Sequence, residues 1–301
     1  MRSLCIGRTV LAVKDYECSQ DEEYIPKKEL RLWLYVQLTN SCNAACSFCV
    51  NAANPSKGCF DVSAFSKTLT QIEPYVSGIS LTGGEPMLDI PLLEEVVAAV
   101  DAQIDRRIEL DLVTNGTELN RLPNLRGLDQ FATIHISRHA SDDAANRRLM
   151  GWRDAPSAAE MASVIRNLPD PGCIVLNCIL QKKGVHDLES ASEYLEMAAS
   201  IGAANVSFIG MFQANDYCRE HYVSPAALGL YSDARYAMWN HFQDYEYCQC
   251  STGDYKAKDR YIRFYYRCPG AVRSPNYCRQ LVYGPDHALR QGFGKAPEVL
   301  L

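Results

Sequence analysis

Three cysteines near the start of the chain have the spacing C-x3-C-x2-C. They are Cys42, Cys46 and Cys49. Thiolates this close in sequence can face one iron–sulfur cluster, and a cubane cluster has four irons. Three ligands leave one iron open, and an open coordination position is typical of a catalytic metal centre. The spacing therefore predicts a catalytic [4Fe–4S] cluster at this loop.

Two other interpretations of the cysteine loop stay open. In the first, Cys59 is a fourth ligand and gives a closed zinc or cluster site. In the second, the spacing is accidental in a chain with 13 cysteines. Neither explains a second motif, Gly83-Gly84-Glu85-Pro86. Its glycines allow close approach of the backbone to a ligand, Glu85 would face a cationic group, and Pro86 stiffens the exit. Taken alone, this motif is a tight turn between a strand and a helix.

Both motifs follow strands in a regular alternation of strands and helices. Six segments rich in Ile, Leu and Val are predicted as strands covered on both faces: 32–38, 78–81, 108–114, 133–137, 174–180 and 206–211. Asp89 is expected to cap one helix that has Pro91 in its first turn. A second apolar stripe ends at Gly202. Ser224 and Pro225 open a third predicted helix, which carries Leu228, Tyr231, Met238 and Phe242.

Six strand–helix units predict an α/β fold with a parallel sheet and right-handed crossovers. Six units are too few for an eight-stranded barrel, so we expect a partial (β/α)6 barrel over residues 31–243. A small extension, rich in Cys, Tyr and Arg, is expected over 244–301. Residues 1–30 hold a short strand candidate at 9–13, and no role follows from them. Alternation places Thr133, His135 and Ser137 on one face, which should line the barrel interior.

Composition restricts the class of protein. The net charge of -6 and the pI near 5.6 argue against a nucleic-acid-binding surface. The sequence contains no apolar run long enough to span a membrane, and its first residues do not form a signal peptide pattern. We therefore expect a cytoplasmic protein in a reducing compartment, where the cysteines bind metal rather than form disulfides.

The cysteine loop and the Gly-Gly-Glu-Pro turn, one strand–helix unit apart, resemble the radical S-adenosylmethionine (SAM) superfamily. The resemblance covers about residues 32–243, and it is greatest for the branch with the cyclic pyranopterin synthase of molybdenum-cofactor synthesis and the SPASM/twitch peptide-modifying enzymes. Further matches follow in the family's order. They are Thr114-Asn115-Gly116-Thr117 after the third strand, Ser137 at the end of the fourth, Asn177 in the fifth, and Phe208-Ile209-Gly210-Met211 at the sixth.

This resemblance implies both cofactors and a reaction. A [4Fe–4S] cluster on the three cysteines would reduce SAM, and the resulting radical would abstract a hydrogen atom from a small-molecule biosynthetic intermediate or a peptide. A protein such as flavodoxin or ferredoxin would supply the electron. The residues implied to bind SAM are Phe48, Gly83, Gly84, Glu85, Pro86, Asn115, Ser137 and Asn177.

The chain departs from the branch directly after Ser137, where Arg138 and His139 replace the usual Leu-Asp pair. An arginine at the barrel mouth would bind a carboxylate or phosphate of the substrate. His139 would donate or accept a proton there. The alternative is that both residues lie in a solvated turn near Asp142 or Asp143.

Four further cysteines lie in the C-terminal extension: Cys248, Cys250, Cys268 and Cys278. They would bind an auxiliary iron–sulfur cluster, as SPASM and twitch extensions do, although their spacing differs from those patterns. The alternative is that they are ordinary buried cysteines. For the chain as a whole, the alternatives to a radical SAM enzyme are a non-enzymatic cysteine-rich metal protein and a thiol redox protein. The Gly83–Pro86 turn favours the enzyme, because a structural metal site does not need it.

Overall fold

The computed structural model describes residues 2–6, 9–13, 32–53, 57–104, 108–241, 251–267, 280–293 and 299–301. Within these residues, six parallel strands follow one another in chain order across the centre of an eleven-stranded sheet. They are β3 (Leu32–Gln37), β4 (Val76–Thr82), β5 (Glu109–Thr114), β6 (Thr133–Ser137), β7 (Ile174–Ile179) and β8 (Asn205–Ile209). All six strand predictions are confirmed to within two residues, as is the mixed α/β class with a parallel sheet.

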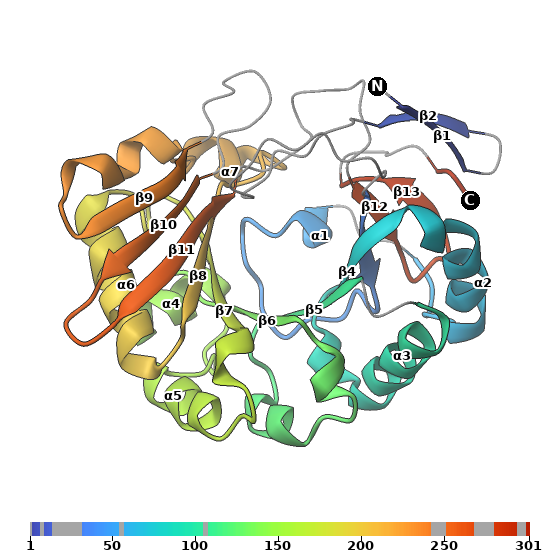
Figure 1. Cartoon of the computed structure of the whole chain (residues 1–301), viewed down its shortest axis with the longest axis horizontal. Coiled ribbons are helices and arrows are strands. Elements are labelled where there is room, and N and C mark those ends of the chain that lie inside the picture. Colours follow the sequence, from blue (N-terminus) through green and yellow to red (C-terminus); the bar gives the residue numbers. More distant parts are fainter. Residues whose placement is uncertain are drawn as a thin grey trace.

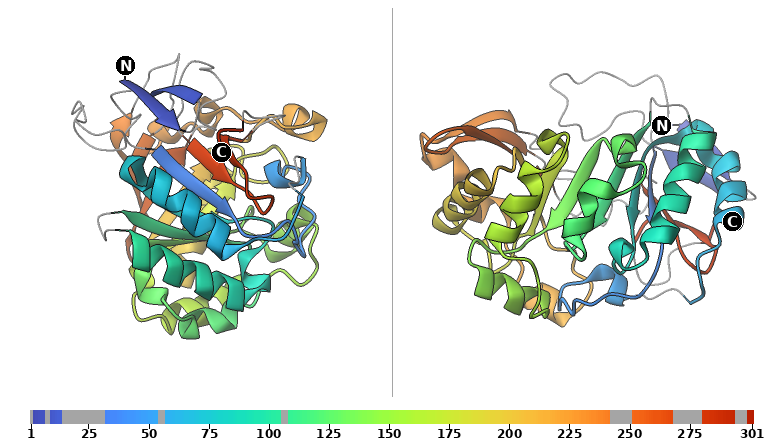
Figure 2. Two further views of the ribbon diagram at one scale, coloured as in Figure 1. Left: turned by 90° about the vertical axis from the view of Figure 1, so that its right-hand side faces the viewer. Right: turned by 90° about the horizontal axis from the view of Figure 1, so that it is seen from below.

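Later segments of the chain extend both edges of this sheet. β12 (Gln280–Tyr283) pairs parallel with β3 and antiparallel with β13 (Leu289–Gln291). β11 (Tyr261–Arg267) pairs parallel with β8, and β10 (Ser251–Lys256) and β9 (Tyr236–His241) continue beyond it. β1 (Arg2–Ile6) and β2 (Thr9–Val13) form a separate hairpin, which lies near the C-terminus in Figures 1 and 2.

Helices cover the outer, convex face of the sheet (Figure 1). The longer ones are α2 (Val62–Ile72), α3 (Ile90–Gln103), α5 (Ala158–Arg166) and α6 (Leu188–Ile201). Figure 2 shows α2 and α3 packed side by side. Shorter helices are α1 (Val50–Ala53), which lies inside the arc of strands, α4 (Asp143–Met150) and α7 (Asp216–Glu220). Short 3-10 helices span Glu73–Tyr75, Pro86–Leu88, Leu119–Asn124, Leu128–Gln130, Pro171–Cys173, Pro225–Leu228 and Leu230–Ser232.

The two faces of the central sheet differ in chemistry. Side chains that point toward the helices are apolar and fully buried, such as Leu112, Ile136 and Phe208. Their neighbours in the sequence, which point to the inner face, include Asp111, His135 and Ser207. The hydrophobic core therefore lies between the sheet and its helices, and the concave side is left polar.

Local sequence signals account for two of the helices. The Asp89 side chain accepts a hydrogen bond from the Leu92 backbone N–H and caps α3, as predicted. α6 ends at Gly202, whose φ of 90° is left-handed, as predicted.

The predicted helix opening at Ser224–Pro225 is wrong. Gly229 adopts a left-handed φ of 62° between two short 3-10 helices, and Met238 lies in strand β9. Pairing of β9 with β10 outweighs the helical spacing of the apolar residues. Phe242 lies outside the described residues.

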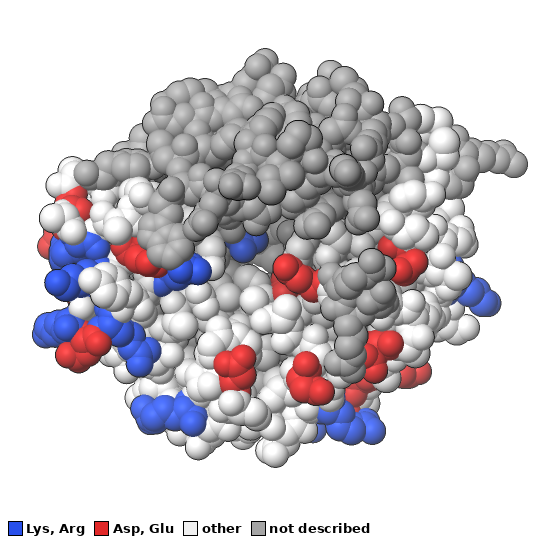
Figure 3. Space-filling model, viewed as in Figure 1, with Lys and Arg blue, Asp and Glu red and all other residues white. Residues whose placement is uncertain are grey.

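The visible surface carries groups of both charges, separated by uncharged areas (Figure 3). In the described ranges, every helix is too short or too polar to cross a membrane. The proposed boundaries at residues 31 and 244 stay predictions.

Candidate functional site

The three predicted ligands lie on the loop that follows β3, at the carboxyl edge of the parallel strands. Cys42 is exposed, Cys46 and Cys49 are half-buried, and all three are free thiols. Burial raises the pKa of Cys46 to about 12 and also raises the pKa of Cys42. A metal must therefore displace protons from these thiols when it binds.

The loop supplies hydrogen-bond donors to its own sulfur atoms. The Ala44 and Ala52 backbone N–H groups each lie 3.4 Å from the Sγ atoms of Cys42 and Cys49 respectively. Asn115 Nδ2 lies 3.6 Å from Cys42 Sγ. Such donors stabilise negative charge on cluster-bound thiolates. Among the described residues, no three ligand side chains converge tightly enough for a single metal ion. Three thiols on one loop are the donor set that iron–sulfur clusters use, so the chemistry of these residues suits a cluster.

The Gly83–Pro86 turn holds the cysteine loop by backbone hydrogen bonds. Gly84 N donates to Thr39 O at 2.5 Å, and Glu85 N donates to Ser41 O at 2.8 Å. A Cβ atom on Gly84 would lie 2.1 Å from Ser41 O, and Gly83 has a φ of +143°. The close approach that these glycines permit in this structure is therefore to the cysteine loop, whereas the sequence suggested an approach to a ligand.

The Glu85 carboxyl group is buried and joins two turns. Its oxygens accept hydrogen bonds from Thr114 Oγ1 at 2.6 Å, Asn115 N at 2.6 Å and Met87 N at 2.9 Å. Burial raises the pKa of Glu85 to about 7. The carboxyl group thus fixes the turn after β4 to the turn after β5, and its expected contact with a cation stays a prediction. Pro86 begins the following 3-10 helix.

A cluster of short polar side chains links the turn after β5 to the cysteine loop. Asn115 Nδ2 donates to Asn43 Oδ1 at 2.9 Å, and Asn43 Nδ2 donates to Thr117 Oγ1 at 2.8 Å. The sequence singled out Asn115 but missed Asn43. Its position between two predicted ligands was a usable signal, because a short amide there can hold the loop.

The other side of the loop is held by contacts that the sequence did not indicate. The Met150 carbonyl accepts hydrogen bonds from Ala45 N at 2.9 Å and Cys46 Sγ at 3.5 Å. Asn215 Nδ2 donates to Ser47 O at 2.9 Å. The end of α4 and the start of α7 therefore position the cysteine loop together with the two turns.

Asn177 and Ser137 lie side by side in the register of β6 and β7, on the inner face. Asn177 Oδ1 lies 2.9 Å from His135 Nδ1. The other nitrogen of the His135 ring lies near the Thr133 hydroxyl group, which in turn donates to Asp111. These contacts agree with the prediction that Thr133, His135 and Ser137 share the inner face. The contact of Asn177 and Ser137 with SAM stays a prediction.

Phe48 packs edge-on against His139, with ring centroids 4.8 Å apart. His139 is buried, and its Nδ1 accepts a hydrogen bond from Ile179 N at 3.2 Å. Burial, with a contribution from Arg138, lowers the pKa of His139 to about 3. The ring is therefore neutral at pH 7 and packs against Phe48, and its expected role in proton transfer stays a prediction.

Arg138 is fully buried, which does not agree with the expected substrate contact. Its Nη2 donates to Asp143 Oδ1 at 2.6 Å and to Ser141 O at 2.8 Å. The Arg138 carbonyl accepts a hydrogen bond from Tyr194 Oη at 2.8 Å. The expected turn near Asp143 exists, but the guanidinium group is inside it and anchors α4 to the sheet.

Arg138→Ala should therefore destabilise the fold and leave SAM affinity almost unchanged. Loss of a buried cation with its ion pair and packing should lower the free energy of unfolding by about 2–4 kcal/mol. Chemical denaturation and equilibrium SAM binding measure the two effects, with Arg148→Ala on the exposed face of α4 as control. If the Arg138→Ala protein were as stable as wild type but had lost substrate turnover, the result would support the predicted contact between Arg138 and the substrate.

The remaining sequence candidates lie away from the loop or outside the described residues. Cys59 is exposed, and its carbonyl lies 2.9 Å from His287 Nε2 beside the turn before β13, so its role as a fourth ligand gains no support. The four cysteines of the predicted auxiliary cluster, Cys248, Cys250, Cys268 and Cys278, lie outside the described residues.

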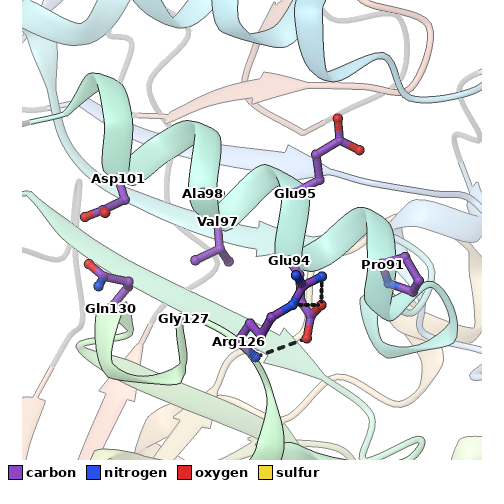
Figure 4. Close-up of a pocket in the computed structure, with 9 residues that line it drawn as sticks. All are labelled: Pro91, Glu94, Glu95, Val97, Ala98, Asp101, Arg126, Gly127 and Gln130. Carbon is purple, nitrogen blue, oxygen red and sulfur yellow. Dashed lines mark hydrogen bonds and ion pairs between the residues drawn. The ribbon is translucent and has the colours of Figure 1, made fainter.

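A hollow of about 540 Å³ lies in the helical layer, between α3 and residues 126–130 (Figure 4). Glu94 and Arg126 form an exposed ion pair across it, with Nε 2.6 Å from Oε2. Ion pairs at the surface contribute little to the stability of the fold. The hollow is on the opposite side of the sheet from the polar inner face, so it is separate from the cysteine loop.

The chain is similar in sequence to known proteins. The model of the radical SAM superfamily matches residues 36–187. A GTP 3′,8-cyclase of Synechococcus sp. (strain CC9902) is 30% identical over 168 residues, which cover 50% of this chain and 47% of that protein. A GTP 3′,8-cyclase of Mycolicibacterium smegmatis is 34% identical over 154 residues, which cover 46% and 42%. The matches span less than half the length of either relative.

Solved structures are similar in fold. The crystal structure of Streptococcus suis SuiB bound to precursor peptide SuiA has a TM-score of 0.59 at 14% identity, and the match covers 87% of this chain and 59% of that one. SuiB bound to S-adenosylmethionine has the same TM-score and identity, with 87% and 60% covered. At this identity the likeness is one of fold alone.

Proposed function

The chain belongs to the radical SAM superfamily, and from this premise we propose that it binds a [4Fe–4S] cluster through Cys42, Cys46 and Cys49 and cleaves SAM reductively. The observation that carries the proposal is the way the cysteine loop is held. Backbone hydrogen bonds from Gly84 and Glu85 fix it to the turn after β4. A loop fixed from several elements supports a cofactor that must be precisely placed.

When bound, the cluster would supply the electron that cleaves SAM to methionine and a 5′-deoxyadenosyl radical, which would abstract a hydrogen atom from the substrate. The residues of the protein would hold the cluster and orient SAM. The three thiolates would bind three irons, and the Ala44 and Ala52 N–H groups would stabilise their charge. SAM would lie against the residues that the family resemblance indicates: Phe48, Gly83, Gly84, Glu85, Pro86, Asn115, Ser137 and Asn177.

We further propose that the curved sheet is a partial (β/α)6 barrel and that the substrate occupies its polar inner face. The substrate would be a small biosynthetic intermediate or a peptide. The relatives are named for a GTP cyclase reaction, and SuiB was solved with a precursor peptide, so both classes have support. A reductant such as flavodoxin or ferredoxin would deliver the electron.

The experiment is SAM cleavage by anaerobically reconstituted protein with a chemical reductant. Wild-type protein should form 5′-deoxyadenosine, and the variant with all three loop cysteines replaced by Ala should form essentially none. Cys59→Ala is the matched control and should resemble wild type. Cleavage by the triple variant would overturn the ligand assignment, and loss of cleavage in Cys59→Ala would favour a closed four-ligand site.

The same samples test the alternative functions. A wild-type protein that binds metal but never cleaves SAM would be a structural metal protein. Iron on the triple variant tests the auxiliary cluster proposed for Cys248, Cys250, Cys268 and Cys278. About four irons per chain would support a second cubane, and none in a folded protein would exclude it.

A further inference from the structure

A chain of polar side chains crosses three neighbouring strands on the inner face of the sheet. It runs from Asp111 on β5, through Thr133 and His135 on β6, to Asn177 on β7. We propose that His135 is a positioning residue that fixes the orientation of the Asn177 side-chain amide toward SAM. This inference rests on the proposed function, in which Asn177 contacts SAM.

Distances define the partners along this series of side chains, and the acceptor-only oxygens of Asp111 and Asn177 define the direction of the two outer hydrogen bonds. Thr133 Oγ1 lies 2.6 Å from Asp111 Oδ1, a carboxylate oxygen, so the hydroxyl group donates to it. Thr133 Oγ1 also lies 2.9 Å from His135 Nε2, and Asp111 Oδ2 lies 3.7 Å from the same nitrogen. These contacts fix the rotation of the imidazole ring about its side-chain bond.

The far edge of the ring acts on Asn177. His135 Nδ1 lies 2.9 Å from Asn177 Oδ1, an atom that only accepts hydrogen bonds, so Nδ1 must carry a proton. With Oδ1 turned toward the ring, the Nδ2 donor of the amide is directed away from His135. Without this bond the amide could turn by half a rotation and present an acceptor instead.

Burial makes each of these hydrogen bonds necessary. Asp111, His135 and Asn177 are each less than a tenth exposed. Water therefore cannot readily replace a missing partner, and each lost hydrogen bond leaves a costly unpaired group. Tyr35 on β3 faces the same region, where burial raises its pKa, with the charge of Arg267 opposing and that of Asp111 adding to the effect. These hydrogen-bonded side chains therefore lie in the interior that the substrate is proposed to occupy.

The test combines a direct observation of the ring with a double-mutant cycle. Long-range proton–nitrogen spectra of histidine-labelled protein without cofactors should show a protonated Nδ1 on His135. An unprotonated Nδ1 would overturn the proposal, because Asn177 Oδ1 would then have no donor.

The cycle measures equilibrium SAM binding to reconstituted, oxidised protein. His135→Leu should weaken SAM affinity about tenfold, the value of one buried hydrogen bond. In the Asn177→Ala background the same change should have almost no further effect, because His135 acts through Asn177. His135→Asn, whose amide nitrogen occupies the place of Nδ1, should recover affinity to within about threefold of wild type. Iron content and the melting temperature serve as controls for the fold.

The outcomes separate the two proposals. Equal losses of affinity from His135→Leu in both backgrounds would make His135 merely structural and overturn its positioning role. Unchanged affinity in His135→Leu alone would overturn it as well. Failure of the wild-type protein to bind SAM would instead overturn the proposed function, and the inference about His135 would fall with it.

Discussion

Gly84→Val should abolish cluster binding and SAM binding together. The new Cβ would lie 2.1 Å from the Ser41 carbonyl oxygen, and the neighbouring atoms are backbone rather than flexible side chain. The cysteine loop must therefore move away from the turn, at a cost of about 3 kcal/mol in the free energy of unfolding. Iron analysis after reconstitution and equilibrium SAM binding measure the two losses.

Gly172→Val is the matched control for this change. A Cβ at Gly172 meets only the Asp170 side chain, at 3.0 Å, on an exposed turn. This variant should bind iron and SAM like the wild-type protein. A Gly84→Val protein with full iron content but weakened SAM affinity would show that Gly84 acts on SAM alone and does not hold the cysteine loop.

Glu85→Gln should destabilise the protein even though the side chain keeps its shape. In the wild-type protein one carboxylate oxygen accepts from Thr114 and Met87, and the other accepts from Asn115 N. An amide has only one acceptor oxygen, so its NH2 group must face a buried N–H donor. The unpaired donor should lower the free energy of unfolding by about 1–3 kcal/mol.

Denaturation of the metal-free protein measures this loss, with Glu95→Gln on the exposed side of α3 as control (Figure 4). The control should change the free energy of unfolding by less than about 0.5 kcal/mol. Equal stability of Glu85→Gln and wild type would mean that the carboxyl group does not hold the two turns together.

The sequence predicted the central sheet well because its strands are rich in Ile, Leu and Val and alternate regularly with helical segments. It also predicted that the cysteine loop and the Gly83–Pro86 turn follow neighbouring strands and lie together, and their binding of the cluster and SAM stays a prediction. It did not predict that Met238 lies in a strand, because the same apolar spacing suits a helix until a partner strand is known.

The environment of Arg138 was not predictable for a related reason. Its place after a strand suggested the barrel mouth, but its burial depends on Asp143 and Tyr194, which other elements bring to it. The contact between Met150 and the cysteine loop joins residues about a hundred positions apart, and no local pattern signals it. What could be predicted is therefore local chemistry, and what could not is the set of long-range partners.

The most direct test of the central claim is electron paramagnetic resonance of the reconstituted, reduced protein before and after SAM is added. A cluster held by Cys42, Cys46 and Cys49 has one iron open, so SAM should bind to it and change the spectrum. The predicted result is a reduced [4Fe–4S] signal that shifts with SAM and is absent when the three cysteines are replaced by Ala. A signal that persists in that variant, or one that SAM leaves unchanged in the wild-type protein, would contradict the account.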